Sequence, residues 1–109
     1  MTTTFEVLAE PSRRTILDLL RDGELPVAAL VDATSLSQPS VSKHLKILRE
    51  AGLVESRTDA QRRLYRLRAD PLRDVDEWLT PYRRMWASSL NALERHLEIM
   101  GGADDGAWS

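Results

Sequence analysis

The stretch from residue 37 to residue 52, SQPSVSKHLKILREAG, carries the side chains best suited to hydrogen-bond a ligand. Short polar groups crowd its first turns, away from the apolar positions Val41, Leu45 and Leu48. A Gln side chain can make a bidentate pair with adenine, and a Ser hydroxyl can contact several bases or a phosphate. The polar front therefore indicates recognition of nucleic acid by four side chains: Gln38, Ser40, Ser42 and Lys43.

A basic segment surrounds this stretch in an otherwise acidic chain. Between Ser35 and Arg68 the sequence holds eight Lys or Arg and three Asp or Glu, which gives the segment a charge of +5. Because the formal net charge of the chain is −2, the remainder carries −7. Such asymmetry is typical of contact with phosphates, although scattered solvated charge would give the same count. Lys46 is placed for backbone contact, and three arginines cluster in a later β-type region: Arg57, Arg62 and Arg63.

Apolar periodicity predicts the elements that must position these groups. Helices are expected at about residues 3–9, 11–22, 26–34, 38–51, 71–79 and 81–100. Ser37 is placed as the N-cap of the fourth helix, since its hydroxyl can accept from free N–H groups of the first turn. Two helices joined by a short turn form a helix-turn-helix, and in DNA-binding versions the second helix lies in the major groove.

Two further runs, LVES and RLYRL, predict a β-hairpin after the fourth helix. The polar stretch between them predicts a loop longer than the tightest hairpin turns, with the three arginines around its tip. Thr80 and Pro81 are expected to break the chain between the last two helices. The expected fold is mainly α with a small β-hairpin, a winged helix-turn-helix. It would form one domain over residues 1–100, followed by a disordered tail over 101–109.

Three motifs resemble the ArsR/SmtB family of bacterial winged-helix repressors: LAEPSRRTILDLL, LSQPSVSKHLKILREAGLVESR and RRLYRL. The resemblance covers about residues 5–100 and implies a homodimer that binds an operator as a repressor. Carried onto this sequence, the base-facing positions are the four polar residues named above, with His44 beside them. Pro39 stands where many relatives have a polar residue, which puts one contact in doubt.

The sequence also bears on metal sensing, the best-known activity of that family. The chain has no Cys and two His, and the segment where a thiolate motif would stand, ELPVAALVDAT, has neither. His96 lies near Glu94 and Glu98, but one His per chain is a weak basis for a Zn or Ni site. We expect no metal and no other cofactor. A metal-responsive (Ni/Zn) repressor using His96 and carboxylates remains an alternative.

An apolar stripe in the last predicted helix steps by three and four residues, the spacing of one helix face. Core packing can explain part of it. The other interpretation is a homodimer interface, because Trp, Tyr and Met are enriched at interfaces. A two-fold dimer would place two recognition helices about 34 Å apart on a pseudo-palindromic operator. The predicted interface residues are Phe5, Leu8, Tyr82, Trp86, Leu90, Leu93 and Leu97.

Other function classes fit the sequence less well. It shows no glycine-rich phosphate loop, no Cys nucleophile and no Ser, His and Asp constellation, so we expect no enzyme. No apolar run approaches the roughly 20 residues of a membrane helix, and no secretory signal is visible, so we expect a cytoplasmic protein. A winged helix that serves mainly protein–protein interaction is the second alternative, which the basic segment disfavours. The effector that would release DNA is not indicated.

Overall fold

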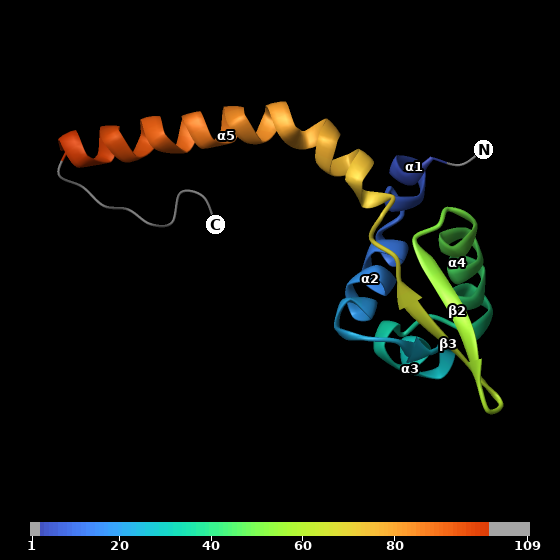
Figure 1. The fold of residues 1–109 in the computed structure, drawn as a ribbon. Coiled ribbons are helices and arrows are strands. Elements are labelled where there is room, and N and C mark those ends of the chain that lie inside the picture. The colour runs from blue at the N-terminus through green and yellow to red at the C-terminus, as the bar shows by residue number, and fades with distance from the viewer. Residues whose placement is uncertain (1–2, 101–109) are drawn as a thin grey trace. The chain divides into compact units, whose positions relative to one another are not determined.

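The computed structural model describes residues 3–100, with side chains described up to residue 98. Its elements are α1 (Thr4–Leu8), α2 (Pro11–Leu19), the 3-10 helix η1 (Leu20–Asp22), β1 (Leu25–Pro26), α3 (Val27–Thr34), α4 (Gln38–Glu50), β2 (Val54–Asp59), β3 (Arg62–Leu67) and α5 (Leu72–Met100) (Figure 1). One compact unit ends at Val75 and a second begins at Asp76, so the first turn of α5 belongs to the first unit. No helix among these residues is long and apolar enough to cross a membrane.

Side-chain caps start the first helices where the sequence predicts them. The hydroxyl of Thr3 accepts from the N–H of Glu6 at 3.2 Å and caps α1. The carboxylate of Glu10 accepts from the N–H of Ser12 at 3.3 Å, with Pro11 in the first turn of α2. Because these groups satisfy free backbone N–H groups, they fix where each helix begins.

The core of the first unit lies between the helices and one face of the sheet. Val41, Leu45 and Leu48 on α4 are fully buried, as their spacing predicts. They belong to one cluster with buried side chains from α1, α2, η1, α3, the strands and the residue before β2: Val7, Ile16, Leu17, Leu20, Leu30, Leu53, Val54 and Tyr65. Burial of each such side chain stabilises the fold by roughly 1.5–3 kcal/mol, which makes α4 a firmly held platform.

The sheet has three antiparallel strands in the order β1-β3-β2, one more than the sequence predicts. Leu25 and Pro26 pair with Tyr65 and Leu64 on β3, so the helix expected from Pro26 instead begins at Val27. Pro26 is tolerated because β1 is an edge strand, where a missing N–H can face away from the ladder.

The hairpin between β2 and β3 is tighter than expected. Asp59 pairs with Arg62, so only Ala60 and Gln61 form the loop, and the prediction of a longer loop is wrong. Ala60 has φ +56°, the left-handed conformation that a turn this short requires. The polar residues expected in the loop lie on the strands instead. They can do so because the hairpin tip is exposed, so strand residues there need not be apolar.

The predicted break at Thr80 and Pro81 is also wrong, because α5 runs through Pro81 without interruption. Pro81 cannot donate the backbone hydrogen bond that a helix interior expects. Polar side chains gather around this turn: the Thr80 hydroxyl and the Arg83 guanidinium both donate to the carbonyl of Asp76 at 3.1 Å. Arg83 also pairs with the Asp76 carboxylate at 2.8 Å. These bonds lie one residue before Glu77, whose carbonyl loses its usual backbone donor at Pro81.

Candidate DNA interface

The turn before α4 is short and internally bonded. Thr34 donates its hydroxyl to the carbonyl of Leu30 at 2.7 Å and accepts from the N–H of Leu36 at 3.4 Å. Ser35 has φ +60°, a left-handed conformation that ends α3 within one residue. The Ser37 hydroxyl accepts from the N–H of Ser40 at 3.2 Å, which confirms the predicted cap. The helix pair with its three-residue turn is therefore a helix-turn-helix.

The residues of α4 predicted to contact DNA fall into two groups by exposure. Gln38, Pro39, Ser42, Lys43 and Lys46 are exposed. None of their side chains forms a hydrogen bond or ion pair with the residues that the structure describes, so this exposed group is open to a ligand.

The other two predicted residues, Ser40 and His44, are half-buried, one helical turn apart on a flank of α4. The Nδ1 atom of His44 is buried, and no hydrogen-bond partner for it lies within the described part of the chain. This flank faces partly into the protein and is less available to a ligand.

The hairpin tip carries two of the predicted arginines. Arg62 and Arg63 begin β3 directly after the two-residue loop, and both are exposed. Arg62 lies 3.7 Å from the carboxylate of Asp59, its opposite partner on β2. The side chain of Arg63 has no ion pair among residues 3–98. The tip is therefore basic, with Arg63 as its most available cation.

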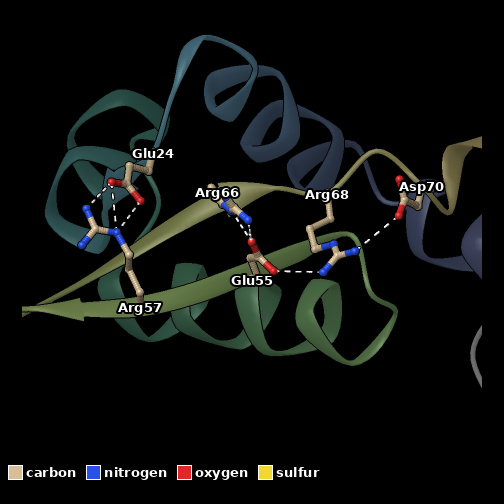
Figure 2. Close-up of polar contacts among 6 residues, drawn as sticks. All are labelled: Glu24, Glu55, Arg57, Arg66, Arg68 and Asp70. Carbon is tan, nitrogen blue, oxygen red and sulfur yellow. Dashed lines mark hydrogen bonds and ion pairs between the residues drawn. The ribbon is translucent and has the colours of Figure 1, made fainter.

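Arg57 is placed differently, on the outer face of the sheet (Figure 2). Its Nε donates to both carboxylate oxygens of Glu24 at 3.0 and 3.2 Å, and an Nη completes a two-pronged contact. This hydrogen bond lowers the pKa of Glu24 below its ordinary value and raises the pKa of Arg57. Because 33 positions separate the two residues, no local signal in the sequence could have found this pair.

A second ion-pair group lies along the same face. Glu55 pairs with Arg66, which stands opposite it on β3, and its other oxygen accepts from Arg68 at 3.0 Å. Arg68 also reaches the carboxylate of Asp70 at 3.3 Å. Hydrogen bonds from Arg66 and Arg68 lower the pKa of Glu55. Glu55 is already counted in the +5 charge of the segment from Ser35 to Arg68, but Glu24 and Asp70 lie outside it, so their pairs with Arg57 and Arg68 offset part of that charge.

The residues predicted for a dimer interface differ in exposure. Tyr82, Trp86 and Leu90 on α5 are 41%, 54% and 40% exposed, as is Phe5 on α1 at 45%. Trp78 and Met85, which the prediction does not include, are also exposed. Leu93 and Leu97 are half-buried, and Leu8 packs against the core of the first unit. Large apolar side chains are thus concentrated on α5.

Residues 3–100 bring together no group of three His, Asp or Glu side chains that could hold a metal ion within one chain. His96 is exposed on α5, with Glu94 and Glu98 exposed beside it. The expected tail over 101–109 lies outside the described residues.

Comparison with known proteins points to one family. The family model described as bacterial regulatory protein, arsR family, matches residues 10–56. The transcriptional repressor SdpR of Bacillus subtilis is 33% identical over 79 residues, which cover 72% of this chain and 88% of that protein. The HTH-type transcriptional regulator Rv2034 of Mycobacterium tuberculosis is 34% identical over 97 residues, covering 89% of this chain and 88% of that protein.

Solved structures agree. The crystal structure of a possible transcriptional regulator for arsenical resistance superposes with a TM-score of 0.69 at 34% identity, over 81% of this chain and 97% of that one. This breadth of similarity confirms the resemblance carried by the sequence motifs and the winged helix-turn-helix fold. The chain therefore belongs to the arsR family of bacterial regulatory proteins, and it is a DNA-binding transcriptional repressor rather than an enzyme.

Proposed function

We propose that this repressor binds a pseudo-palindromic operator as a homodimer, with α4 of each protomer in a major groove and the hairpin tip against the DNA backbone. The observation that carries the proposal is the contrast between the two sides of α4. Its back is fully buried at Val41, Leu45 and Leu48, while Gln38, Ser42 and Lys43 in its front are exposed. A helix held in this way can present side chains to base edges without reorganising.

Base reading is assigned first to Gln38 and Ser42, because both are exposed near the N-terminus of α4. Lys43 and Lys46 would contact phosphates or, in the case of Lys43, a guanine edge. Ser40 and His44 stay in the proposed set as flanking positions, since each is half-buried. Pro39 is exposed but donates no hydrogen bond, so its proposed contact is packing on a thymine methyl.

The hairpin would supply contacts that do not depend on sequence. Arg62 and Arg63 stand at the tip, and Arg57 lies three positions before the loop on β2. Arginines next to a groove grip phosphates or enter a narrow minor groove. The proposal thus divides the interface into a helix that reads bases and a hairpin that adds affinity.

A homodimer through α5 is supported by its exposed aromatic and aliphatic side chains, with Phe5 and Leu8 of α1 as further proposed members. Trp86→Glu should dissociate the dimer, since it would bury a carboxylate in an apolar interface. Ser88→Glu is the matched control, because two residues further along a helix the side chain points to the opposite side. Sedimentation should show a dimer for the unmodified chain and the control. A monomer at micromolar concentration in the unmodified chain would refute the dimer.

Selection of bound fragments from random DNA tests the operator. The expected result is an enriched sequence with two inverted half-sites, centred about 34 Å apart, or roughly ten base pairs. Enrichment of one half-site alone would refute the two-fold arrangement. No enrichment at all would refute base reading by α4. A cytoplasmic location belongs to the same proposal, because a bacterial repressor acts on DNA inside the cell.

A further inference from the structure

The pair formed by Glu24 and Arg57 joins two edges of the sheet. Glu24 directly precedes β1 and Arg57 lies on β2, with β3 between these strands. Figure 2 shows the two side chains reaching toward each other across the outer face of the sheet. Both Nε contacts fall within 3.0–3.2 Å, a geometry that satisfies both oxygens of the carboxylate. A phosphate offers an arginine the same two-oxygen pattern.

Strand register places this pair next to the proposed backbone contacts. Arg57 and Asp59 share one face of β2 because side chains alternate along a strand. Arg62 stands opposite Asp59 and therefore lies on that same face. Two of the three hairpin arginines are thus accompanied by a carboxylate of the protein, but the contact to Glu24 is much the closer one.

Arg57 has room to leave its partner. Its side chain is 58% exposed in the pair, whereas that of Glu24 is 31% exposed. A hollow of about 220 Å³ lies beside it, lined by Glu24, Glu55, Ser56, Arg57, Leu64 and Arg66. An exposed ion pair of this kind is worth little in free energy, so an incoming phosphate can replace the carboxylate.

We infer that Glu24 is an internal competitor of DNA: its carboxylate occupies the guanidinium of Arg57 in the free protein, and DNA binding exchanges it for a backbone phosphate. The inference rests on the proposed contact between the hairpin and the DNA backbone. It gives Glu24, which touches no DNA itself, a role in setting affinity for all sequences. The competing carboxylate is charged at neutral pH, as an ordinary glutamate is, and the hydrogen bond from Arg57 lowers its pKa further.

Replacing the competitor with a neutral group of the same shape tests the exchange. Glu24→Gln should bind operator and random DNA of equal length about two- to fivefold more tightly, and equally so for both, as measured by fluorescence anisotropy. Added to Arg57→Ala, the same substitution should change nothing. Weaker binding by Glu24→Gln, or a gain that persists in the Arg57→Ala chain, would overturn the inference.

Glu55→Gln is the matched control. It adds the same unit of charge on the same face of the sheet, but Glu55 pairs with Arg66 and Arg68 rather than Arg57. We expect a much smaller gain from it. Equal gains from both variants would show a general effect of net charge and would contradict the competitor role. Thermal melting of each variant checks that the fold is kept.

Arg63→Ala separates failure of this inference from failure of the proposed function. If Arg63→Ala weakens DNA binding while Glu24→Gln has no effect, the hairpin contacts DNA but the exchange at Arg57 is wrong. If Arg63→Ala has no effect on any DNA, the proposed contact between the hairpin tip and the backbone is itself wrong.

Discussion

The exposed polar groups of α4 and Arg57 on the hairpin are held in opposite ways in the free protein. On α4, Gln38, Ser42 and Lys43 are exposed above an apolar back that is fully buried. On the sheet, Arg57 is already bound to a carboxylate of the protein. Groups on a rigid support lose little freedom on binding, whereas a paired arginine must first give up its partner. We therefore expect specificity to come from the helix and a moderated, sequence-independent affinity from the hairpin.

The largest expected effect is loss of the support beneath the helix. Leu45→Ala should lower the free energy of unfolding by about 2–5 kcal/mol, because it leaves a cavity under α4. Chemical denaturation measures this loss, and Lys46→Ala, at the adjacent exposed position, is the control. A loss below 1 kcal/mol would mean that α4 is not firmly held, and the contrast with the hairpin would disappear.

Removal of the cap should have a smaller effect. Ser37→Ala should lower the free energy of unfolding by about 0.5–2 kcal/mol, since the N–H of Ser40 loses its partner. Ser42→Ala, one turn later and exposed, should leave stability nearly unchanged. If the two substitutions were equally destabilising, the hydroxyl of Ser37 would have no special role at the start of α4.

The smallest expected effect is the pH dependence of the sheet. The pKa of Glu24 and that of Glu55 are lowered by their arginine partners. Their contribution to stability is thus present above the ordinary carboxyl value of 4.5 and is lost as the pH falls through the lowered folded-state values. In urea melts from pH 7 to pH 3, a chain with Glu24→Gln and Glu55→Gln should lose less stability than the unmodified chain. Equal losses would mean that the exposed pairs contribute nothing.

The helix could be predicted from sequence because its signals are local. The cap at Ser37 and the spacing of Val41, Leu45 and Leu48 each act within one or two turns, and the structure confirms both. The family motifs allowed the function to be predicted because they are also local: they lie in this segment and its neighbours. Which side chains touch DNA stays a prediction.

The sheet could not be predicted in full. One of its strands is very short, its turn lacks the usual residues, and some of its contacts join residues far apart in the sequence. β1 has two residues, too few for any alternation, and it is recognised only through its pairing with Tyr65 and Leu64. The loop at Ala60 and Gln61 lacks the Gly or Asn that usually marks so tight a turn. The partner of Arg57 lies 33 positions away, so its charge could be counted from the sequence but its pairing could not.

The helix break expected at Pro81 failed for a different reason, because proline alone does not end a helix. Thr and Pro in succession are typical of a new helix start, and the sequence pattern alone favours that interpretation. The structure continues α5 with side-chain bonds from Thr80 and Arg83 to Asp76. Pro81 removes one backbone donor, the one to the carbonyl of Glu77, and α5 continues despite that loss.

A salt titration of Gln38→Ala and Arg63→Ala, each on operator and on random DNA, tests the division between helix and hairpin most directly. Gln38→Ala should weaken operator binding by about 1–3 kcal/mol and leave random DNA nearly unaffected. Arg63→Ala should weaken both DNAs equally and make the dependence of log K on log salt shallower by about 0.9, the value for one phosphate. If both variants lost operator and random DNA alike, with the same salt slope, the account would be contradicted.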